Sequence, residues 1–246
     1  MGLGGPGAQE ALNGHDGQDG QDGQDGQDSR SLRPGPLASV KDMNSIDFIT
    51  LEVADTEAAA DFYASALGLD KQVRLRAAEA PTSGFRGFTV SLVVSQPSTV
   101  NGFVDAALAA GATALKPVAK SLWGYGGVVQ APDGSIWKVA SSEKKDTGPD
   151  TRQFDKMVLL LGAEDVAASK KFYVEHGLTV AKSYGRKYVE FALPGSPVGL
   201  GLYGRKALAK DAGVSPEGSG AHRLAIGAGA GPFTDPDGFA WETAEG

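Results

Sequence analysis

Histidine and carboxylate side chains are the groups in this chain that could carry acid–base or metal chemistry, because the chain contains no cysteine. Without cysteine there are no thiolate nucleophiles, thiolate metal ligands or disulfides. The chain has three histidines, and His15 lies in a stretch rich in glycine, aspartate and glutamine. Two imidazoles remain, His176 and His222. His176 stands at the predicted end of a helix, where a basic group suits the helix dipole, and we interpret it as structural.

A ten-residue phrase that occurs twice adds the second chemical clue. The copies read APDGSIWKVA at 131–140 and DPDGFAWETA at 235–244. Each predicts a Pro-Asp-Gly turn followed by a short strand. At the equivalent position of that strand the first copy has Lys138 and the second has Glu242. A protonated lysine repels a cation, so any cation chemistry is predicted in the second copy.

The elements around the first phrase begin with a strand at 46–53, where apolar and polar side chains alternate. Asp55 is the predicted N-cap of a helix that ends at Gly68. The other predicted elements of this copy are strands at 69–75, 88–95, 112–115, 127–130 and 136–140, a loop at 77–83, and a helix capped by Ser98 that ends at Gly111.

The same order of elements restarts after the first copy. Asp165 precedes Phe172 by the spacing at which Asp55 precedes Phe62, and a Phe-Tyr pair followed by Gly-Leu recurs. The predicted elements are strands at 157–161, 188–191, 198–203 and 222–226, a helix capped by Asp165 that ends at Gly177, and a short helix at 206–212. We interpret the recurrence as a duplication whose copies pack together and are each partly trimmed.

The segments outside the two copies are polar. Residues 1–43 are predicted to be a disordered tail, because glycine, aspartate and glutamine dominate and few apolar side chains are available for a core. Residues 142–153 are polar and contain Gly148-Pro149, which is typical of a linker. The predicted domains are therefore 44–143 and 154–246, with the linker at 144–153.

The composition excludes several classes of function. Hydrophobic residues make up 41% and charged residues 22% of the chain, as in globular proteins. A net charge of −7 gives no electrostatic case for nucleic acid or an anionic membrane surface. The apolar runs are far shorter than the roughly 18 residues of a membrane span, and the start lacks the apolar core of a signal peptide. We expect a soluble cytoplasmic protein, either a monomer or a homodimer.

Three of these features together resemble a known family. They are the first strand, the Asp-capped helix ending in Phe-Tyr and Gly-Leu, and the closing Asp-Pro-Asp-Gly-x-x-x-Glu, and they cover roughly residues 45–246. The set resembles the vicinal oxygen chelate superfamily, which includes glyoxalase I, bleomycin-resistance proteins, fosfomycin-resistance enzymes and extradiol dioxygenases. The resemblance implies an α+β fold of two tandem glyoxalase/bleomycin-resistance-type domains built of βαβββ modules.

In metal-using members of that family, ligands come from the first strand, from a strand of the second module, and from a glutamate after the Pro-Asp-Gly turn. The resemblance places Phe48, then Arg86 or Phe88, and Lys138 at these positions of the first copy. None of these is a suitable cation ligand. We interpret Lys138 as a solvated strand lysine.

The second copy retains part of the ligand set that the resemblance implies. The mapped positions are Lys156, His222 and Glu242, and Glu190 is a third candidate ligand if it faces the same cavity. Catalytic metal sites usually need about three protein ligands and an open position. The alternative for His222 is a surface or hydrogen-bonded strand residue. Glu242 or His222 could also act as a base, and Glu242 could simply face solvent.

Aromatic residues provide candidate contacts for an organic ligand. The segment LWGYGG at 122–127 resembles the aromatic and glycine segment that edges the cavity in this family. We therefore predict Trp123, Tyr125 and Phe85 as ligand-binding residues, since aromatic faces suit flat organic molecules. The alternative is that they close the core beneath a turn.

Three functional hypotheses follow. In the first, the protein has a degraded metal site and binds a small organic molecule in a sheet-lined cavity, for resistance or sequestration. In the second, it is a metal-dependent lyase or isomerase of the glyoxalase type, with one divalent ion held in the second domain by His222 and Glu242. In the third, it has a structural or interaction role without a ligand.

Overall fold

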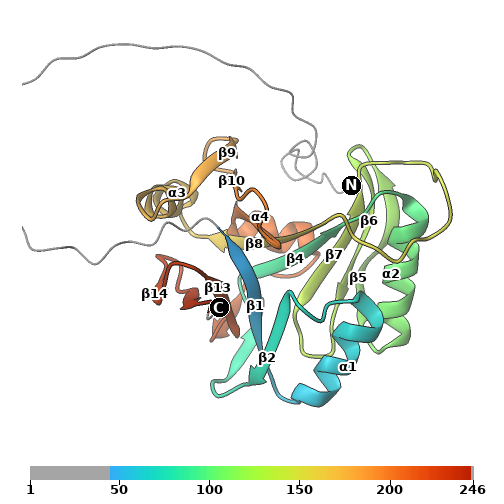
Figure 1. Ribbon diagram of the computed structural model, residues 1–246, viewed down its shortest axis with the longest axis horizontal. Coiled ribbons are helices and arrows are strands. Elements are labelled where there is room, and N and C mark those ends of the chain that lie inside the picture. The colour runs from blue at the N-terminus through green and yellow to red at the C-terminus, as the bar shows by residue number, and fades with distance from the viewer. Residues whose placement is uncertain (1–44, 245–246) are drawn as a thin grey trace, which may run out of the picture.

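The computed structural model describes residues 45–244, which form four helices and fifteen strands (Figure 1). The predicted tail at 1–43 lies outside the described residues. The helices are α1 (Thr56–Leu67), α2 (Pro97–Ala109), α3 (Val166–Glu175) and α4 (Arg205–Ala212). The strands are β1 (Ile46–Val53), β2 (Val73–Ala77), β3 (Thr82–Gly84), β4 (Phe88–Val93), β5 (Thr113–Ser121), β6 (Gly124–Gln130), β7 (Ile136–Ser141), β8 (Lys156–Ala163), β9 (Thr179–Ser183), β10 (Tyr188–Ala192), β11 (Val198–Gly204), β12 (Gly218–Gly220), β13 (Leu224–Ala228), β14 (Phe233–Thr234) and β15 (Ala240–Thr243).

An eight-stranded sheet is built from two complete βαβββ modules. Its strand order is β5-β6-β7-β4-β8-β11-β10-β9. The first module is β4-α2-β5-β6-β7 and the second is β8-α3-β9-β10-β11. In each module the last strand runs parallel to the first, and the two modules meet where β4 and β8 pair antiparallel. The predicted α+β fold with βαβββ modules is therefore confirmed.

A five-stranded sheet, in the order β14-β15-β13-β1-β2, joins the two ends of the described chain. β1 and β2 are parallel and are linked by α1, while β13 pairs antiparallel with β1. Each large sheet thus contains strands from both predicted domains. The domain boundaries themselves stay a prediction.

The sequence signals for α1 and α3 hold in detail. Asp55 accepts hydrogen bonds from the N–H groups of Glu57 and Ala58, and Gly68 ends α1 in the left-handed conformation. Asp165 caps α3 in the same way. No helix in residues 45–244 is long and apolar enough to cross a membrane.

The start of α2 differs from the prediction. Its N-cap is Gln96 and its first residue is Pro97, rather than a helix capped by Ser98. Proline suits this position because the first turn leaves its N–H groups without helical acceptors. The Ser98 N–H instead donates to Asp146 Oδ1 at 2.6 Å, so the predicted linker segment lies against the helix start.

Two further predictions need correction between the sheets. The predicted loop at 77–83 contains most of β3, which pairs with β12 in a separate two-stranded sheet. The strand predicted from His222 begins at Leu224, so His222 lies just before β13. Both segments are short and rich in glycine and serine, and they carry no apolar periodicity that could reveal the pairing.

Two tyrosines, one on α1 and one on α3, each contact a Pro-Asp-Gly turn in the opposite large sheet. Tyr63 of α1 donates to Asp133 Oδ2 at 3.0 Å, in the turn before β7. Tyr173 of α3 donates to Asp235, in the turn before β15. Both tyrosines are buried in a core that the two large sheets share. The phrases that repeat in the sequence therefore join the two sheets.

Candidate functional site

The predicted metal ligands Glu190, His222 and Glu242 lie apart. Glu242 is on β15 of the five-stranded sheet, Glu190 is on β10 of the eight-stranded sheet, and His222 lies between β12 and β13. Residues 45–244 contain no group of three or more His, Cys, Asp or Glu placed to hold a metal ion. Glu190 therefore does not share a sheet with Glu242, and its role as a third ligand stays a prediction.

Glu242, the predicted catalytic and metal-binding acid, is held by a polar network. Its Oε1 accepts a hydrogen bond from Thr50 Oγ1 at 2.5 Å, and its Oε2 pairs with Arg76 Nη1 at 2.8 Å. Arg76 also pairs with Glu52 Oε1 at 2.9 Å. A carboxylate that already has a guanidinium partner is poorly placed to accept a divalent ion.

The first-strand position on the same face of the sheet is filled by an aromatic ring. Phe48 is buried, and a Cβ atom on Gly227 would lie 2.3 Å from its ring. The Arg74 guanidinium carbon lies over that ring, 3.4 Å from its centre. We call this surface, formed by Phe48, Thr50, Glu52, Arg74, Arg76, Gly227 and Glu242, the Glu242 face. Its own side chains occupy it.

His222 connects the two sheets through its ring. Nδ1 lies 2.5 Å from the Arg86 carbonyl oxygen, just before β4, and Nε2 lies 3.0 Å from the Asp237 carbonyl oxygen, in the second Pro-Asp-Gly turn. The ring stacks on Phe239 with 4.0 Å between centroids. Neither nitrogen faces an open coordination position, so these contacts favour the structural alternative for His222.

Glu190 forms an ion pair with Lys156, the residue that stands at the first-strand position of the second copy. Lys156 Nζ lies 3.1 Å from Glu190 Oε1. Glu190 is only 8% exposed, and its Oε2 has no hydrogen-bond partner among the described residues. Glu190 therefore pairs with the residue at the first-strand position instead of sharing a cation with it.

Lys138 lies on one face of the eight-stranded sheet, and α4 covers that face. Lys138 Nζ pairs with Asp211 Oδ2 of α4 at 2.9 Å, and both side chains are 22% exposed. Lys116 Nζ donates to the carbonyl oxygens of Lys210 and Asp211 at the helix end, at 2.9 and 2.5 Å. Lys138 is therefore not a solvated strand lysine but an anchor for a helix.

Apolar side chains complete this contact. Leu208, Ala209 and Ala212 of α4 are buried in a cluster with residues of β6, β7 and β8. We call this surface the Lys138 face. It is formed by Val128, Ile136, Lys138, Leu160, Tyr188, Glu190 and Tyr203, with α4 against it. The sequence predicts α4 but not its position.

The predicted ligand-binding residues Phe85, Trp123 and Tyr125 are not brought together. Phe85 is buried in the cluster that holds α4. Trp123 lies in the turn between β5 and β6. Tyr125 donates from its hydroxyl to Asn101 Oδ1 of α2 at 3.0 Å, on the helix side of the sheet. Their role in binding stays a prediction.

A cavity of about 860 Å³ lies at the start of α4, between the segment that joins β9 to β10 and the end of β11. We call it the tyrosine pocket. It is lined by Ala163, Glu164, Tyr184, Arg186, Lys187, Tyr188, Tyr203, Gly204, Arg205, Lys206 and Ala207. The Tyr188 and Tyr203 rings are 4.9 Å apart, and those of Tyr184 and Tyr188 are 6.2 Å apart. Sequence reasoning missed this site, although Tyr184, Arg186, Lys187 and Tyr188 stand together in the chain.

A smaller polar cavity of about 310 Å³ shares Glu164 and Arg205 with the tyrosine pocket. Phe85 and His222 both line it, so two predicted site residues do meet there. Arg205, which lines both cavities, donates from Nη2 to the Phe85 carbonyl oxygen at 2.8 Å. Burial lowers the pKa of Arg86, which also lines this cavity and donates to the Asp133 carbonyl oxygen.

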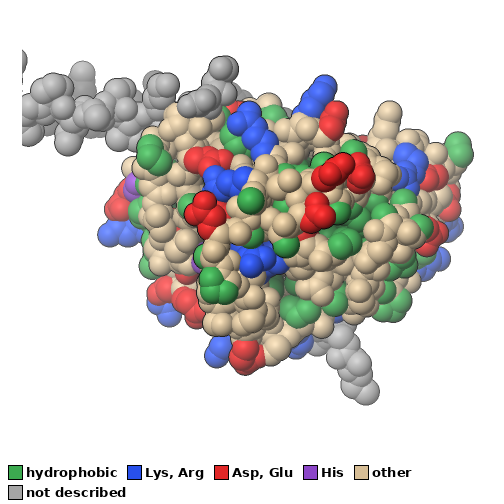
Figure 2. All heavy atoms as spheres, turned by 90° about the horizontal axis from the view of Figure 1, so that it is seen from below, with side chains coloured by type: hydrophobic (Ala, Val, Ile, Leu, Met, Phe, Trp, Pro, Cys, Tyr) green, Lys and Arg blue, Asp and Glu red, His purple; other side chains and the backbone are tan. Residues whose placement is uncertain are grey.

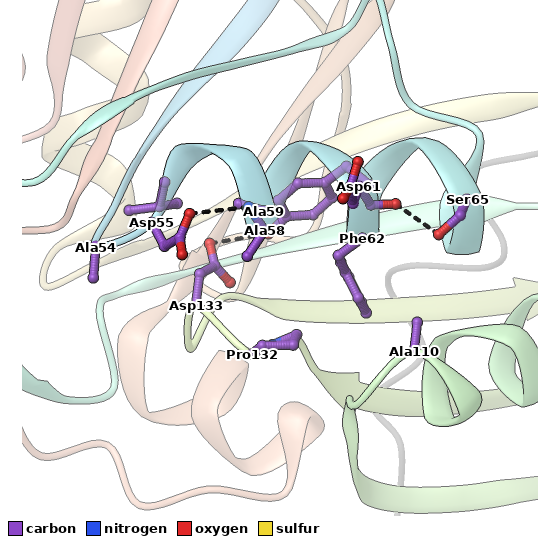
Figure 3. A pocket seen from close by; sticks show the side chains of 12 residues that line it. Ala54, Asp55, Ala58, Ala59, Asp61, Phe62, Ser65, Ala110, Pro132 and Asp133 are labelled. Carbon is purple, nitrogen blue, oxygen red and sulfur yellow. Dashed lines mark hydrogen bonds between the residues drawn. The ribbon is translucent and has the colours of Figure 1, made fainter.

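A third hollow, of about 530 Å³, lies beside α1 and the first Pro-Asp-Gly turn (Figure 3). Two of its acidic side chains have structural partners, because Asp55 caps α1 and Asp133 accepts from Tyr63. Apolar side chains, including Ala58 and Pro132, form much of the lining. Acidic side chains also lie among apolar and basic ones over the lower face of the molecule (Figure 2). The capping of α1 and the hydrogen bond from Tyr63 account for Asp55 and Asp133 without a ligand.

Comparison with solved structures places the fold. The chain is similar to glyoxalase I from Zea mays, with a TM-score of 0.53 and 15% identity over 80% of this chain and 90% of that chain. Two single-residue variants of that enzyme match with TM-scores of 0.51 and 15% identity, over 80% of this chain. No family sequence model and no curated protein sequence matches the chain.

These matches identify the class of structure. The chain has a fold of the glyoxalase I type, as its repeated motifs predict. The identity is low, so the likeness concerns the fold and not the reaction.

Proposed function

We propose that this protein binds a small organic molecule in the tyrosine pocket and that it does so without a metal centre of the glyoxalase type. The observation that carries the proposal is the pocket itself, a cavity of about 860 Å³ with three tyrosines along one side. Ligand sites for small molecules typically measure about 300–1,000 Å³ and combine aromatic walls with a few polar groups. The pocket fits that description better than the polar cavity or the hollow beside α1.

The shape of the aromatic lining favours a flat ligand. Tyr188 and Tyr203 are buried on adjacent strands, whereas Tyr184 is 41% exposed at the turn before β10. Buried rings provide a fixed wall and an exposed ring can cover a ligand once it has entered. Offset or edge contacts between aromatic rings contribute about 0.5–1.5 kcal/mol beyond area burial.

The contacts of the predicted ligands make the metal-dependent alternative less suitable. Glu242 is paired with Arg76, and both nitrogens of His222 contact carbonyl oxygens. Recruiting them to one ion would break both sets of contacts and bring together groups of different segments. Binding in the tyrosine pocket needs no such rearrangement.

Calorimetric titration of the full chain with 2-naphthalenemethanol and naphthalene-2-carboxylate tests the proposal. We expect saturable binding of at least one probe, and a loss of about tenfold in affinity for Tyr184→Ala, which removes one ring from the pocket. The backbone bond from the Tyr184 N–H to the Tyr188 carbonyl oxygen is unaffected by that change.

Two matched variants separate the possible locations. Val174→Ala removes an exposed apolar side chain of α3 away from the pocket and should leave the affinity unchanged. Trp123→Ala tests the aromatic segment predicted from the sequence. A loss of binding in Trp123→Ala with full binding in Tyr184→Ala would place the ligand at the β5–β6 turn, and no saturable heat with either probe would refute the proposal.

A further inference from the structure

The tyrosine pocket carries a local charge opposite to that of the whole chain. Four basic side chains, Arg186, Lys187, Arg205 and Lys206, line it against one acid, Glu164. The full chain has a net charge of −7. Basic groups concentrated in one cavity of an acidic protein create a field that attracts anions to that cavity.

The basic side chains are largely uncompensated. Arg186, Lys187 and Lys206 are exposed, and no salt bridge among the described residues involves any of them. Arg205 approaches Glu164 at 3.7 Å, but the Glu164 side chain is 76% exposed, so water screens that pair. The positive charge of the pocket is therefore available to a ligand.

The start of α4 adds to this charge. Residues 204–207, which form the N-cap and the first turn of α4, all line the pocket. Gly204 has no side chain to cap the helix, and no acidic residue stands in the first turn. Backbone N–H groups in a first turn lack helical acceptors, and the helix dipole is positive at that end.

The two buried tyrosines add no negative charge that would weaken the positive field of the pocket. Burial, followed by the charge of Glu190, raises the pKa of Tyr188, and burial followed by Asp211 raises the pKa of Tyr203. Both phenols therefore stay neutral at physiological pH, and their rings provide an apolar wall next to the cationic groups. A flat apolar body and one acidic group match this combination.

From this arrangement we infer that the tyrosine pocket selects planar aromatic carboxylates over neutral molecules of the same shape. The inference rests on the proposed function and specifies its ligand class. The ring of the ligand lies against Tyr188 and Tyr203. The carboxylate lies toward the start of α4 and its neighbouring basic side chains.

Three probes of equal ring size test the inference in the full chain. They are naphthalene-2-carboxylate, 2-naphthalenemethanol and 2-naphthylmethylammonium, titrated by calorimetry. We expect the carboxylate to bind about tenfold more tightly than the alcohol, because hydrogen bonds to a charged group are the stronger ones. The ammonium should bind most weakly, and added salt should weaken the carboxylate but not the alcohol.

A charge variant locates the preference. In the double variant Arg186→Gln with Lys206→Gln, the carboxylate should lose about tenfold in affinity while the alcohol binds unchanged, which also shows that the pocket is intact. Lys210→Gln is the matched control, because Lys210 is an exposed residue of α4 that does not line the pocket.

The outcomes distinguish the inference from the proposed function. Equal binding of the carboxylate and the alcohol to the wild type would overturn the inference and leave the proposed function standing. A preference for the carboxylate that survives in the double variant would also overturn it. Failure of all three probes to bind would refute the proposed function itself.

Discussion

The Glu242 face and the Lys138 face occupy equivalent places in the two large sheets, but they are closed by opposite means. On the Glu242 face the acid after the Pro-Asp-Gly turn pairs with Arg76 of β2, across β13 and β1 of the same sheet. On the Lys138 face the lysine after the turn pairs with Asp211 of a helix that covers the sheet. One face is filled by its own side chains, and the other by an added element.

The difference shows how a duplicated fold can keep one open cavity. The side chains of the Glu242 face lie close to the sheet, with the Phe48 ring against Gly227. On the Lys138 face, α4 packs in one buried cluster with Leu160, Tyr188 and Tyr203, and the start of the helix borders the tyrosine pocket. The tyrosine pocket lies where the start of α4 meets the segment between β9 and β10.

The largest effect on stability is expected for a change in α4, the helix that packs on the Lys138 face. Leu208→Ala removes a side chain that is 0% exposed between α4 and the sheet. We expect the free energy of unfolding to fall by about 3 kcal/mol, from lost transfer energy and a residual cavity. Chemical denaturation followed by circular dichroism measures this.

Lys210→Ala, at an exposed position of the same helix, is the control and should change the free energy of unfolding by less than about 0.5 kcal/mol. If Leu208→Ala were as mild as this control, α4 would not be an integral part of the Lys138 face. The contrast between the two faces would then disappear.

A smaller effect is expected on the Glu242 face. Glu242→Ala leaves the Thr50 hydroxyl, in a residue that is 5% exposed, without its acceptor, and it also removes a partner of Arg76. We expect a loss of about 2 kcal/mol in the free energy of unfolding. Glu242→Gln keeps an acceptor for Thr50 and should lose less.

The metal-dependent alternative makes a different prediction for the same variants. If Glu242 were a metal ligand, the wild type would take up Mn²⁺ or Zn²⁺ in stoichiometric amounts and Glu242→Ala would lose it. We expect both proteins to show the same uptake by metal analysis after dialysis. A loss of metal confined to the variant would contradict the description of the Glu242 face as closed.

The sequence predicts local structure on both faces better than it predicts their partners. Asp55 and Asp165 predict the starts of α1 and α3, because helix capping depends only on residues that are neighbours in the chain. The pairing of Lys138 with Asp211 joins residues far apart in the chain, and nothing local encodes it.

The candidate site illustrates the same limit. Tyr184 and Tyr188 are close in sequence, but Tyr203 joins them only through the register of β10 on β11. Glu190 and Glu242 lie in different sheets because the strands of both copies are shared between the sheets. Pattern and resemblance identify the fold, whereas the location of a cavity depends on which strands pair and on where α4 lies.

Loss of the ion pair between Lys138 and Asp211 should have a moderate effect on stability. Both side chains are 22% exposed, so the pair is partly shielded from water. Lys138→Met keeps the apolar stem and removes the charge, and we expect a loss of about 1 kcal/mol in the free energy of unfolding. A double-mutant cycle with Asp211→Leu measures the coupling, and additive losses would show that the pair does not hold α4.

The smallest effect is on the pH dependence of stability, and it should differ between the two Pro-Asp-Gly turns. The first phrase begins with Ala131 where the second has Asp235. Burial raises the pKa of Asp235, although hydrogen bonds from Tyr173 and from the Phe239 N–H act in the opposite direction.

A carboxyl group with a raised folded-state pKa binds protons more readily when the protein is folded. The stabilising contribution of protonation is therefore present at low pH, and it is lost as the pH rises from about 3.9, the ordinary value, through the folded-state pKa. Asp235→Asn should remove this part of the pH dependence from denaturation curves recorded above pH 4. Asp133→Asn, which removes the carboxylate that accepts from Tyr63, is the comparison in the first turn. Parallel curves for the wild type and Asp235→Asn would show that the two turns do not differ in this respect.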